Sequence, residues 1–300
     1  MLEISNPTEA ELETVLNFAF QHLPPDNRSL QTESMLRQYQ SGHMDLRGIF
    51  QAKHDGELAG VMYAQSRPEG SVMLWIPAMA KGYSLETMLE PLEQFCLSQN
   101  VFAAIALADR EQSFDEQTFC VLGQFRFLSD MIHLVAEIMP HEAAEEPYRL
   151  NFVPLSEYAE DVSVRLTCLV KETYRNTLDF PDLMQIAPVE KVLQGYKVNT
   201  QYRPDLWFFL QKEDADVGVL LLTDVSPEQF ELTYMGLIES VRRQGLSREI
   251  VRFAKEITAE WHRTLLLTAV DAGNIPACQT YLSQGFKAWD RKKVYVRLFS

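Results

Sequence analysis

Residues 230–248 read F-E-L-T-Y-M-G-L-I-E-S-V-R-R-Q-G-L-S-R and change character halfway along. Apolar and polar side chains alternate in the first half, which predicts a strand. One face of that strand is expected to carry Glu231, Thr233, Met235 and Leu237. Basic and small residues then crowd into 242–248, which predicts a tight turn. Apolar residues recur at helical spacing from Glu249 to Trp261 and predict a helix with one buried face.

A strand, a basic turn and a helix N-terminus together favour an anion site. The first backbone N–H groups of a helix have no partner within the helix, and its dipole attracts negative charge. The stretch therefore predicts a cradle for a pyrophosphate. An ordinary strand-to-helix connection, in which Gly245 only permits the turn, is the other interpretation that the turn alone leaves open.

A second motif follows at 270–286, V-D-A-G-N-I-P-A-C-Q-T-Y-L-S-Q-G-F. It matches the pattern V-x-x-x-N-x-x-A-x-x-x-Y-x-x-x-G-F of the GNAT superfamily of acyl-CoA N-acyltransferases at every fixed position. R-R-Q-G-L-S at 242–247 matches that family's Q/R-x-x-G-x-G/A pyrophosphate signature, with Ser247 in the last small-residue position. The two motifs stand in the family's order, so the sequence strongly resembles this superfamily.

The resemblance implies acetyl-CoA as co-substrate. Its pantetheine arm is expected along Met235, Gly236 and Leu237, and a glycine within a strand is independently typical of close approach by another chain. Asn274 is expected to contact the arm, or simply to cap the following helix. The pyrophosphate is expected on the turn, at Arg242, Arg243, Gln244, Gly245, Leu246, Ser247 and Arg248.

The resemblance also suggests catalytic roles. Tyr281 occupies the family's general-acid position and would protonate the departing thiolate, whose basicity is comparable to that of a phenol. A core aromatic residue is the other interpretation. Glu231 is the first candidate for the base that deprotonates the amine, and Glu239 a weaker one. Alternatively, Glu231 is only an exposed carboxylate at the start of a strand.

Asp179 and Asp182 follow the first predicted helix of the second half. In the family that this sequence resembles, the connection after this helix lines the acceptor pocket. They are predicted to bind the positive charge of an amine, a pairing that is strong only when shielded from water. Both could instead be solvated loop or cap residues. The predicted activity is direct transfer of an acetyl group to a primary amine of a small molecule or peptide. A non-catalytic module that binds or senses acyl-CoA is the alternative.

The composition of the chain limits the classes of partner and cofactor that we expect. A net charge of −15 disfavours nucleic acid and anionic membranes and favours cationic amines. The 4 cysteines lack metal-ligand spacing and the 6 histidines are dispersed, so neither a metal nor a disulfide framework is expected. No apolar run reaches the roughly 18–20 residues of a membrane span, and no signal-peptide core is recognised. We therefore expect a cytoplasmic protein, as monomer or homodimer.

The chain of 300 residues is long enough for two domains. The acidic stretch 141–147 predicts a boundary between a domain at 1–140 and another at 148–300. The first half repeats the order of elements in decayed form, with M-A-K-G-Y-S at 79–84 in place of R-R-Q-G-L-S. An α+β fold of two tandem GNAT-like domains is expected, each a mixed, mostly antiparallel sheet flanked by helices, with the first degenerate. The layout is similar to that of proteins resembling mycothiol synthase.

Two details of the second half are also predicted. A helix is expected over roughly Glu157–Glu172. Residues 287–290 and 294–299 are expected to form the last antiparallel pair of strands.

Overall fold

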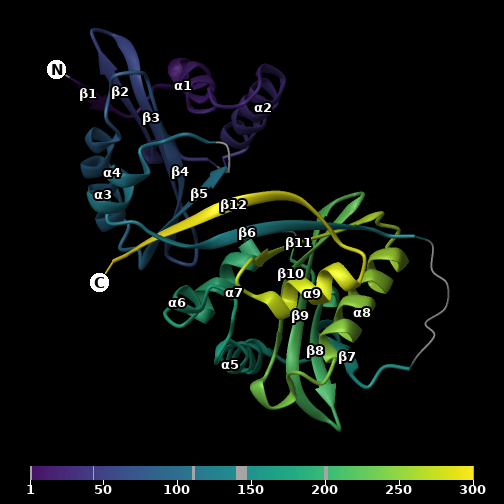
Figure 1. Ribbon diagram of the computed structural model, residues 1–300. Helices are drawn as coiled ribbons and strands as arrows, with labels where there is room; N and C mark the ends of the chain where they lie inside the picture. Colours follow the sequence, from purple (N-terminus) through teal and green to yellow (C-terminus); the bar gives the residue numbers. More distant parts are fainter. Residues whose placement is uncertain (1, 43, 110–111, 140–146, 199–201, 300) are drawn as a thin grey trace. The chain divides into compact units, whose positions relative to one another are not determined.

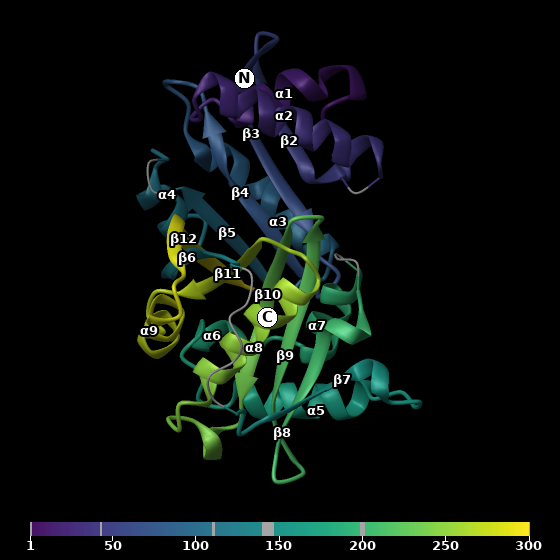
Figure 2. The ribbon, with the colours of Figure 1, turned by 90° about the vertical axis from the view of Figure 1, so that its right-hand side faces the viewer.

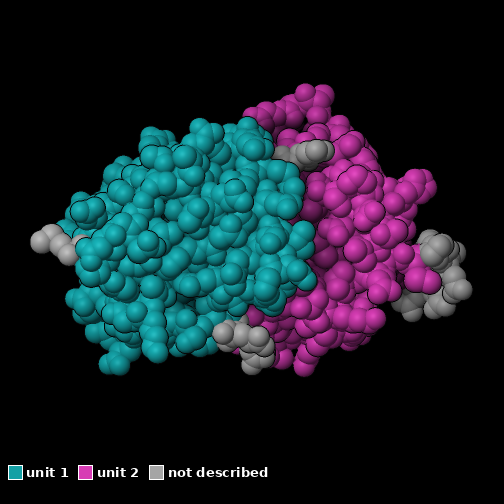
Figure 3. All heavy atoms as spheres, turned by 90° about the horizontal axis from the view of Figure 1, so that it is seen from above, with its two compact units in different colours: residues 1–128, 292–300 teal, residues 129–291 magenta. Residues whose placement is uncertain are grey.

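The computed structural model describes residues 2–42, 44–109, 112–139, 147–198 and 202–299 (Figure 1). These residues form two compact units (Figure 3). Unit 1 comprises residues 1–128 and 292–300, and unit 2 comprises residues 129–291. Most of the predicted boundary, residues 141–146, lies outside the described residues. None of the described helices is both long and apolar enough to cross a membrane.

Unit 1 holds a sheet in which every neighbouring pair is antiparallel except β4 with β5. The order of its strands is β1 (Glu3–Ser5), β2 (Ile49–His54), β3 (Glu57–Ser66), β4 (Ser71–Met79), β5 (Ala103–Asp109) and the end of β12 (Lys287–Leu298). Its helices are α1 (Leu12–Ala19), α2 (Pro25–Gln40), α3 (Leu89–Ser98) and α4 (Glu116–Val121).

Unit 2 repeats this plan, with β10 and β11 as its parallel pair. The order is β6 (Arg126–Glu137), β11 (Leu265–Asp271), β10 (Gln229–Leu237), β9 (Ala215–Ser226), β8 (Trp207–Lys212) and β7 (Asn151–Pro154). Its helices are α5 (Ser163–Tyr174), α6 (Pro181–Met184), α7 (Val189–Val198), α8 (Leu246–Glu260) and α9 (Ile275–Ser283). Figure 1 shows α5 and α8 on opposite sides of the strands, and Figure 2 gives a second view. The predicted α+β fold of two similar domains is confirmed.

The apolar spacing that predicted α8 is the reason for its position. Ile250, Val251 and Ala254 are buried in the core of unit 2, as expected for one face of a 3.6-residue repeat.

The first helix of unit 2 was predicted too early, because α5 starts at Ser163. A 3-10 turn occupies 155–157, and the Asp161 carboxylate accepts the N–H of Ser163 at 2.8 Å, so the chain turns before the helix begins.

The last two predicted strands are a single strand, β12, so the predicted antiparallel pair is wrong. The polar run at 290–293 suggested a turn, but its side chains have partners along an extended chain. Arg291 binds Asp130, and Lys292 binds Asp109. Charged side chains with partners on neighbouring strands can therefore continue a strand.

Each half of the sequence contributes one strand to the unit formed mainly by the other half, and these strands are β6 and β12. Residues 131–137 of β6, from the first half, pair with all seven residues of β11 in unit 2. Residues 292–298 of β12, at the end of the chain, pair with β5 in unit 1. Each unit therefore completes its sheet with a strand from the other half of the chain. The domain boundaries at 140 and 148 stay a prediction.

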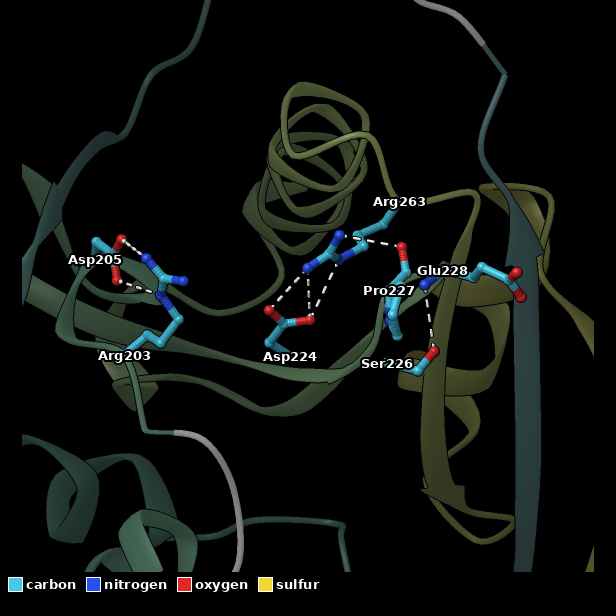
Figure 4. A network of polar contacts seen from close by, with 7 residues as sticks. All are labelled: Arg203, Asp205, Asp224, Ser226, Pro227, Glu228 and Arg263. Carbon is cyan, nitrogen blue, oxygen red and sulfur yellow. Dashed lines mark hydrogen bonds and ion pairs between the residues drawn. The ribbon is translucent and has the colours of Figure 1, made fainter.

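A network of polar contacts fixes the start of β11 relative to the β9–β10 hairpin (Figure 4). The Arg263 guanidinium donates to both carboxylate oxygens of Asp224 at 2.9–3.2 Å and to the Pro227 carbonyl at 3.1 Å. The backbone N–H groups of Thr264 and Leu265 donate to the Glu228 carbonyl. Bidentate pairing of this kind specifies geometry as well as strength, so this end of the β10–β11 pair is held closed.

Replacing Arg263 with alanine should lower the free energy of unfolding by about 3 kcal/mol, because it leaves the Asp224 carboxylate, only 10% exposed, without its cation. Urea denaturation would measure the change. Lys171→Ala is the matched control, because Lys171 and Glu190 pair in solvent, and its cost should stay below about 1 kcal/mol. Equal effects of both substitutions would contradict a structural role of Arg263.

Candidate active site

The parallel pair of unit 2 opens into a cavity. Gln229 lies opposite Leu265 and Glu231 opposite Leu267, but the pairing ends there. The Thr268 hydroxyl donates to the Leu232 carbonyl at 3.0 Å at the point of separation. Beyond it, residues 232–237 and 268–270 line opposite walls of a cavity of about 590 Å³. An arm of extended chain would fit between two strands that diverge in this way.

A β-bulge in β10 changes which side chains share a face. Leu232 lies opposite Leu222 and Tyr234 opposite Leu221, so one residue of β10 is extra. Because side chains alternate along a strand, the insertion moves every later residue to the other face. The prediction that Glu231 shares a face with Met235 is therefore wrong. Glu231 lies on the face of Tyr234, and the period-2 pattern contained no sign of the bulge.

The backbone of β10 offers hydrogen-bonding groups on the cavity side. The Ile238 N–H donates to the Val217 carbonyl of β9 at 2.9 Å. Successive residues of a strand point their N–H groups in alternate directions, so those of Leu237 and Met235 point away from β9. The Leu237 carbonyl, on the same side, accepts from Arg242 Nε at 2.9 Å. Met235 and Leu237 thus face the opened edge, and Met235, Gly236 and Leu237 all line the cavity.

Gly236 is required by packing on the α5 side of β10. A Cβ atom at this position would lie 2.5 Å from the Tyr234 hydroxyl and 2.7 Å from the Thr173 side chain. Those two hydroxyls bond each other at 2.7 Å. The glycine therefore makes room for this pair, which is a different close approach from the one predicted for a ligand.

The turn before α8 has the form of an anion cradle. Arg243 and Gly245 both adopt left-handed backbone conformations, with φ of 62° and 78°, and α8 begins at Leu246. None of the described residues accepts a hydrogen bond from the amides of Arg243 to Ser247. Such a run of free N–H groups at a helix start binds anions. Arg242, Arg243, Gly245, Leu246 and Ser247 line the cavity.

Two arginines hold this turn in place through backbone carbonyls. Arg242, predicted to contact the pyrophosphate, donates to the carbonyls of Leu237, Asn176 and Thr173 at 2.9–3.0 Å. Arg149 donates to the Gln244 carbonyl at 3.0 Å and pairs with Glu249. Arg149 was missed from the sequence because it lies about 100 residues away and no motif marks it.

Tyr281 and Asn274 come together on α9 at the wall of the cavity. Asn274 Oδ1 accepts the N–H of Ala277 at 3.3 Å, so it caps the helix, one of its two predicted roles. Tyr281 is 4% exposed, and burial raises the pKa of its phenol while the Thr268 hydroxyl opposes the rise. The phenol is therefore protonated at neutral pH, as a proton donor must be.

The predicted acidic residues fall into different environments. Asp179 lines the cavity, and burial raises its pKa to about 6. Burial also raises the pKa of Glu231, which precedes the point of separation. Glu239 lines the cavity and accepts from the Asn176 amide at 3.0 Å. Within the described part of the chain, the predicted site residues that do not line the cavity are Glu231, Gln244, Arg248 and Asp182.

Unit 1 has a cavity of about 510 Å³ at the end of its own parallel pair. Counted from the first pair of each unit, Pro77 takes the place of Met235. A proline has no N–H to offer to a bound chain. The Gln21 side chain also donates to the Met79 carbonyl at 3.4 Å. Unit 1 therefore lacks the N–H group that Met235 offers in unit 2, as expected of a degenerate copy.

Residues 172–286 match the model of the acetyltransferase (GNAT) family. A search among curated protein sequences finds no significant match. Among solved structures, a GCN5-related N-acetyltransferase from Sphaerobacter thermophilus is similar, with a TM-score of 0.66 and 15% identity over 99% of this chain and 95% of that one.

Two further structures share the fold. A tandem GNAT protein from the clavulanic acid biosynthesis pathway has a TM-score of 0.53 and 11% identity, over 99% of this chain and 98% of that one. A glucosamine N-acetyltransferase region of a fungal multi-domain GH3 β-N-acetylglucosaminidase has a TM-score of 0.60 and 11% identity, over 99% of this chain and 38% of that one. The similarity to mycothiol synthase stays a prediction.

The sequence motifs, the diverging parallel strands and the family match all concern the same segment. The cavity, the cradle and Tyr281 lie within it. Residues 172–286 therefore match the model of the acetyltransferase (GNAT) family, in a chain that shares the fold of tandem GNAT proteins.

Proposed function

We propose that this protein transfers an acetyl group from acetyl-CoA directly to a primary amine. One observation carries the proposal: a single cavity joins the cradle before α8 to the opened edge of β10 and to Tyr281. These three features match the three parts of acetyl-CoA, which are a diphosphate, an amide-bearing arm and a thioester.

Each part of the donor has a group in the cavity that suits its chemistry. Free N–H groups from Arg243 to Ser247 would bind the diphosphate. The edge groups of Met235 and Leu237 would pair with the arm as an added strand does. A strand N–H near the thioester would also stabilise the oxyanion that forms when the amine adds. The sequence roles of Gln244 and Arg248 remain predictions that the cavity lining does not support.

The reaction then follows from the position of Tyr281. The amine nitrogen attacks the thioester carbonyl carbon, and the tetrahedral intermediate breaks its C–S bond. Tyr281 donates its phenolic proton to the departing thiolate. A group that removes a proton from the amine is also needed, because an ammonium ion is not a nucleophile.

A module that binds acyl-CoA without turning it over is the second candidate. The replacement of Met235 by Pro77 in unit 1 favours it, because this chain tolerates loss of binding groups in one copy. The protonated Tyr281 in the unit 2 cavity favours catalysis. The acceptor, the cytoplasmic location and the oligomeric state stay predictions.

Two measurements on the full chain test the proposal. Calorimetry with acetyl-CoA should show binding at one site per chain. Release of free thiol should then follow addition of an amine from a panel of spermidine, glucosamine, 2-phenylethylamine and a lysine-containing peptide. Binding without turnover on any of these would support the sensing module, and no binding would contradict both candidates.

Replacing Arg243 with glutamate should raise the Kd for acetyl-CoA about 10-fold or more, because it places a negative charge beside the diphosphate. Arg248→Glu is the matched control, since Arg248 does not line the cavity and its Kd should stay within about 2-fold. Calorimetry at two salt concentrations checks both, because the charge effect shrinks at high salt. An equal loss in both variants would mean that overall charge, and not the cradle, governs binding.

A further inference from the structure

We propose that Asp179, and not Glu231, is the general base that takes the proton from the acceptor amine. The inference rests on the proposed acetyl transfer and assigns its missing proton acceptor. Asp179 was predicted only to bind the charge of the amine. The structure gives it a position and an environment suited to moving a proton as well.

Asp179 lies in the cavity wall together with Tyr281. Its Oδ1 accepts the N–H of Asp271 at 3.2 Å, which fixes the carboxylate against the end of β11. No described residue donates to its Oδ2. One oxygen is therefore anchored and the other is free to accept a proton from a bound amine.

The neighbouring carboxylate is committed to the backbone. Asp271 is 3% exposed, its Oδ2 accepts the N–H of Phe180 at 2.9 Å, and its Oδ1 accepts the N–H of Gly273 at 2.7 Å. Phe180 has φ of 41°, a conformation that is unusual for a bulky residue. This arrangement locks the loop between α5 and α6 to β11 and positions Asp179.

The environment of Asp179 supports the same role. Burial raises its pKa to about 6, the Asp271 N–H opposes the rise, and the Asp271 carboxylate adds to it. A base works best when its pKa is close to the pH at which it operates. The titratable groups that interact with Asp179 come from β11, α5, β10 and α9, and they are Asp271, Tyr174, Tyr234, Tyr281 and Cys278.

Glu231 is less suited to this role. It pairs opposite Leu267, before the strands separate, and does not line the cavity of the described chain. The bulge also places it on the opposite face from Met235.

The proposed sequence balances its protons. Asp179 Oδ2 takes one proton from the ammonium ion, and the neutral nitrogen then forms a bond to the thioester carbon. The C–S bond breaks and the thiolate receives the proton of Tyr281. The second nitrogen proton restores the phenol through solvent, and Asp179 releases its proton to water. One ammonium ion and one thioester give one amide, one thiol and one proton.

The kinetic test uses the panel amine that the wild-type protein turns over fastest. In the wild type, ionisation of Asp179 should make kcat/KM rise with pH near pH 6. Asp179→Asn should abolish this ascending limb of the pH profile and lower kcat/KM at least 100-fold, while the Kd for acetyl-CoA stays within 2-fold. Asp179→Glu should restore part of the activity together with an ascending limb. Glu172→Gln, which replaces an exposed carboxylate of α5 paired with Arg175, should keep activity within 3-fold. Glu231→Gln should retain the rise of activity with pH near pH 6.

A second measurement needs no acceptor. A carboxyl group whose pKa is raised in the folded state stabilises the fold below its unfolded pKa and loses this contribution as the pH rises through about 6. The Tm of Asp179→Asn should therefore exceed that of the wild type at pH 7.5, and the difference should shrink towards pH 4. A difference independent of pH would show that the pKa of Asp179 is not raised in the folded protein, and would contradict the environment on which the inference rests.

The outcomes separate this inference from the proposed function. A wild-type protein that transfers acetyl groups, with Asp179→Asn equally active or with its pH limb unchanged, would overturn the role of Asp179 alone. If Glu231→Gln abolished the rise of kcat/KM with pH, the base would be Glu231 instead. No transfer to any panel amine would overturn the proposed function, and the role of Asp179 with it.

Discussion

Replacing Tyr281 with phenylalanine should lower kcat about 100-fold while the Kd for acetyl-CoA stays within 2-fold. The substitution keeps the ring in the unit 2 core, where it contacts Phe286, and removes only the proton donor. The thiolate would then leave without receiving a proton, and the rate would lose the contribution of general-acid catalysis to this step. Burial raises the pKa of Tyr281, so the wild-type phenol does not lose its proton between pH 6 and 9 and adds no descending limb there.

Tyr202→Phe is the matched control for this experiment. Tyr202 packs on Trp207 in the same unit and does not line the described cavity, so kcat should change less than 2-fold. Steady-state thiol release and calorimetry measure both quantities. If Tyr281→Phe turned over at the wild-type rate, the phenol would not be the acid, and its position would reflect packing alone.

A fragment of residues 148–300, the predicted catalytic domain, should fail to fold by itself. It lacks β6, which pairs with every residue of β11 and contributes buried Leu134 and Ala136 to the core of unit 2. The fragment would expose an unpaired strand edge at β11, which lines the unit 2 cavity, and such an edge promotes aggregation. Its last strand would also lose β5, against which buried Tyr295 packs in unit 1.

Coexpression of residues 1–147 with residues 148–300 tests the same argument. The two fragments together contain both exchanged strands, so they should form a soluble complex that binds acetyl-CoA. Size-exclusion chromatography and circular dichroism would compare the lone fragment, the pair and the intact chain. A lone fragment that folds and binds acetyl-CoA would show that the predicted boundaries define an independent domain.

Local patterns in the sequence predicted the elements around the site because those elements depend on local spacing. The alternation at 230–237 and the apolar repeat after Gly245 indicated β10 and α8, and the motif at 270–286 placed Asn274 and Tyr281 on α9. Each of these features is set by residues within a few positions of each other. The turn at 242–248 was predicted in the same way, from one glycine and its neighbours.

Other features escaped the sequence because they depend on residues far apart along the chain. The bulge in β10 is defined by pairing with β9, and it changed the face on which Glu231 lies. Arg149 reaches the cradle from about 100 residues away. The pair formed by Asp179 and Asp271 joins the α5–α6 loop to β11 across 92 positions.

The sequence by itself determined the family resemblance, the strand-turn-helix cradle and the place of Tyr281, since short motifs carry the backbone conformations that these features need. Only the tertiary structure decided which strand completes each sheet and which carboxylate stands in the cavity. Strand pairing and the burial of a charge are properties of neighbours in space. The spacing of residues along the chain does not indicate that β6 and β12 each pair in the unit of the other half. Nor does it indicate that the Asp271 N–H anchors the Asp179 carboxylate in the cavity wall.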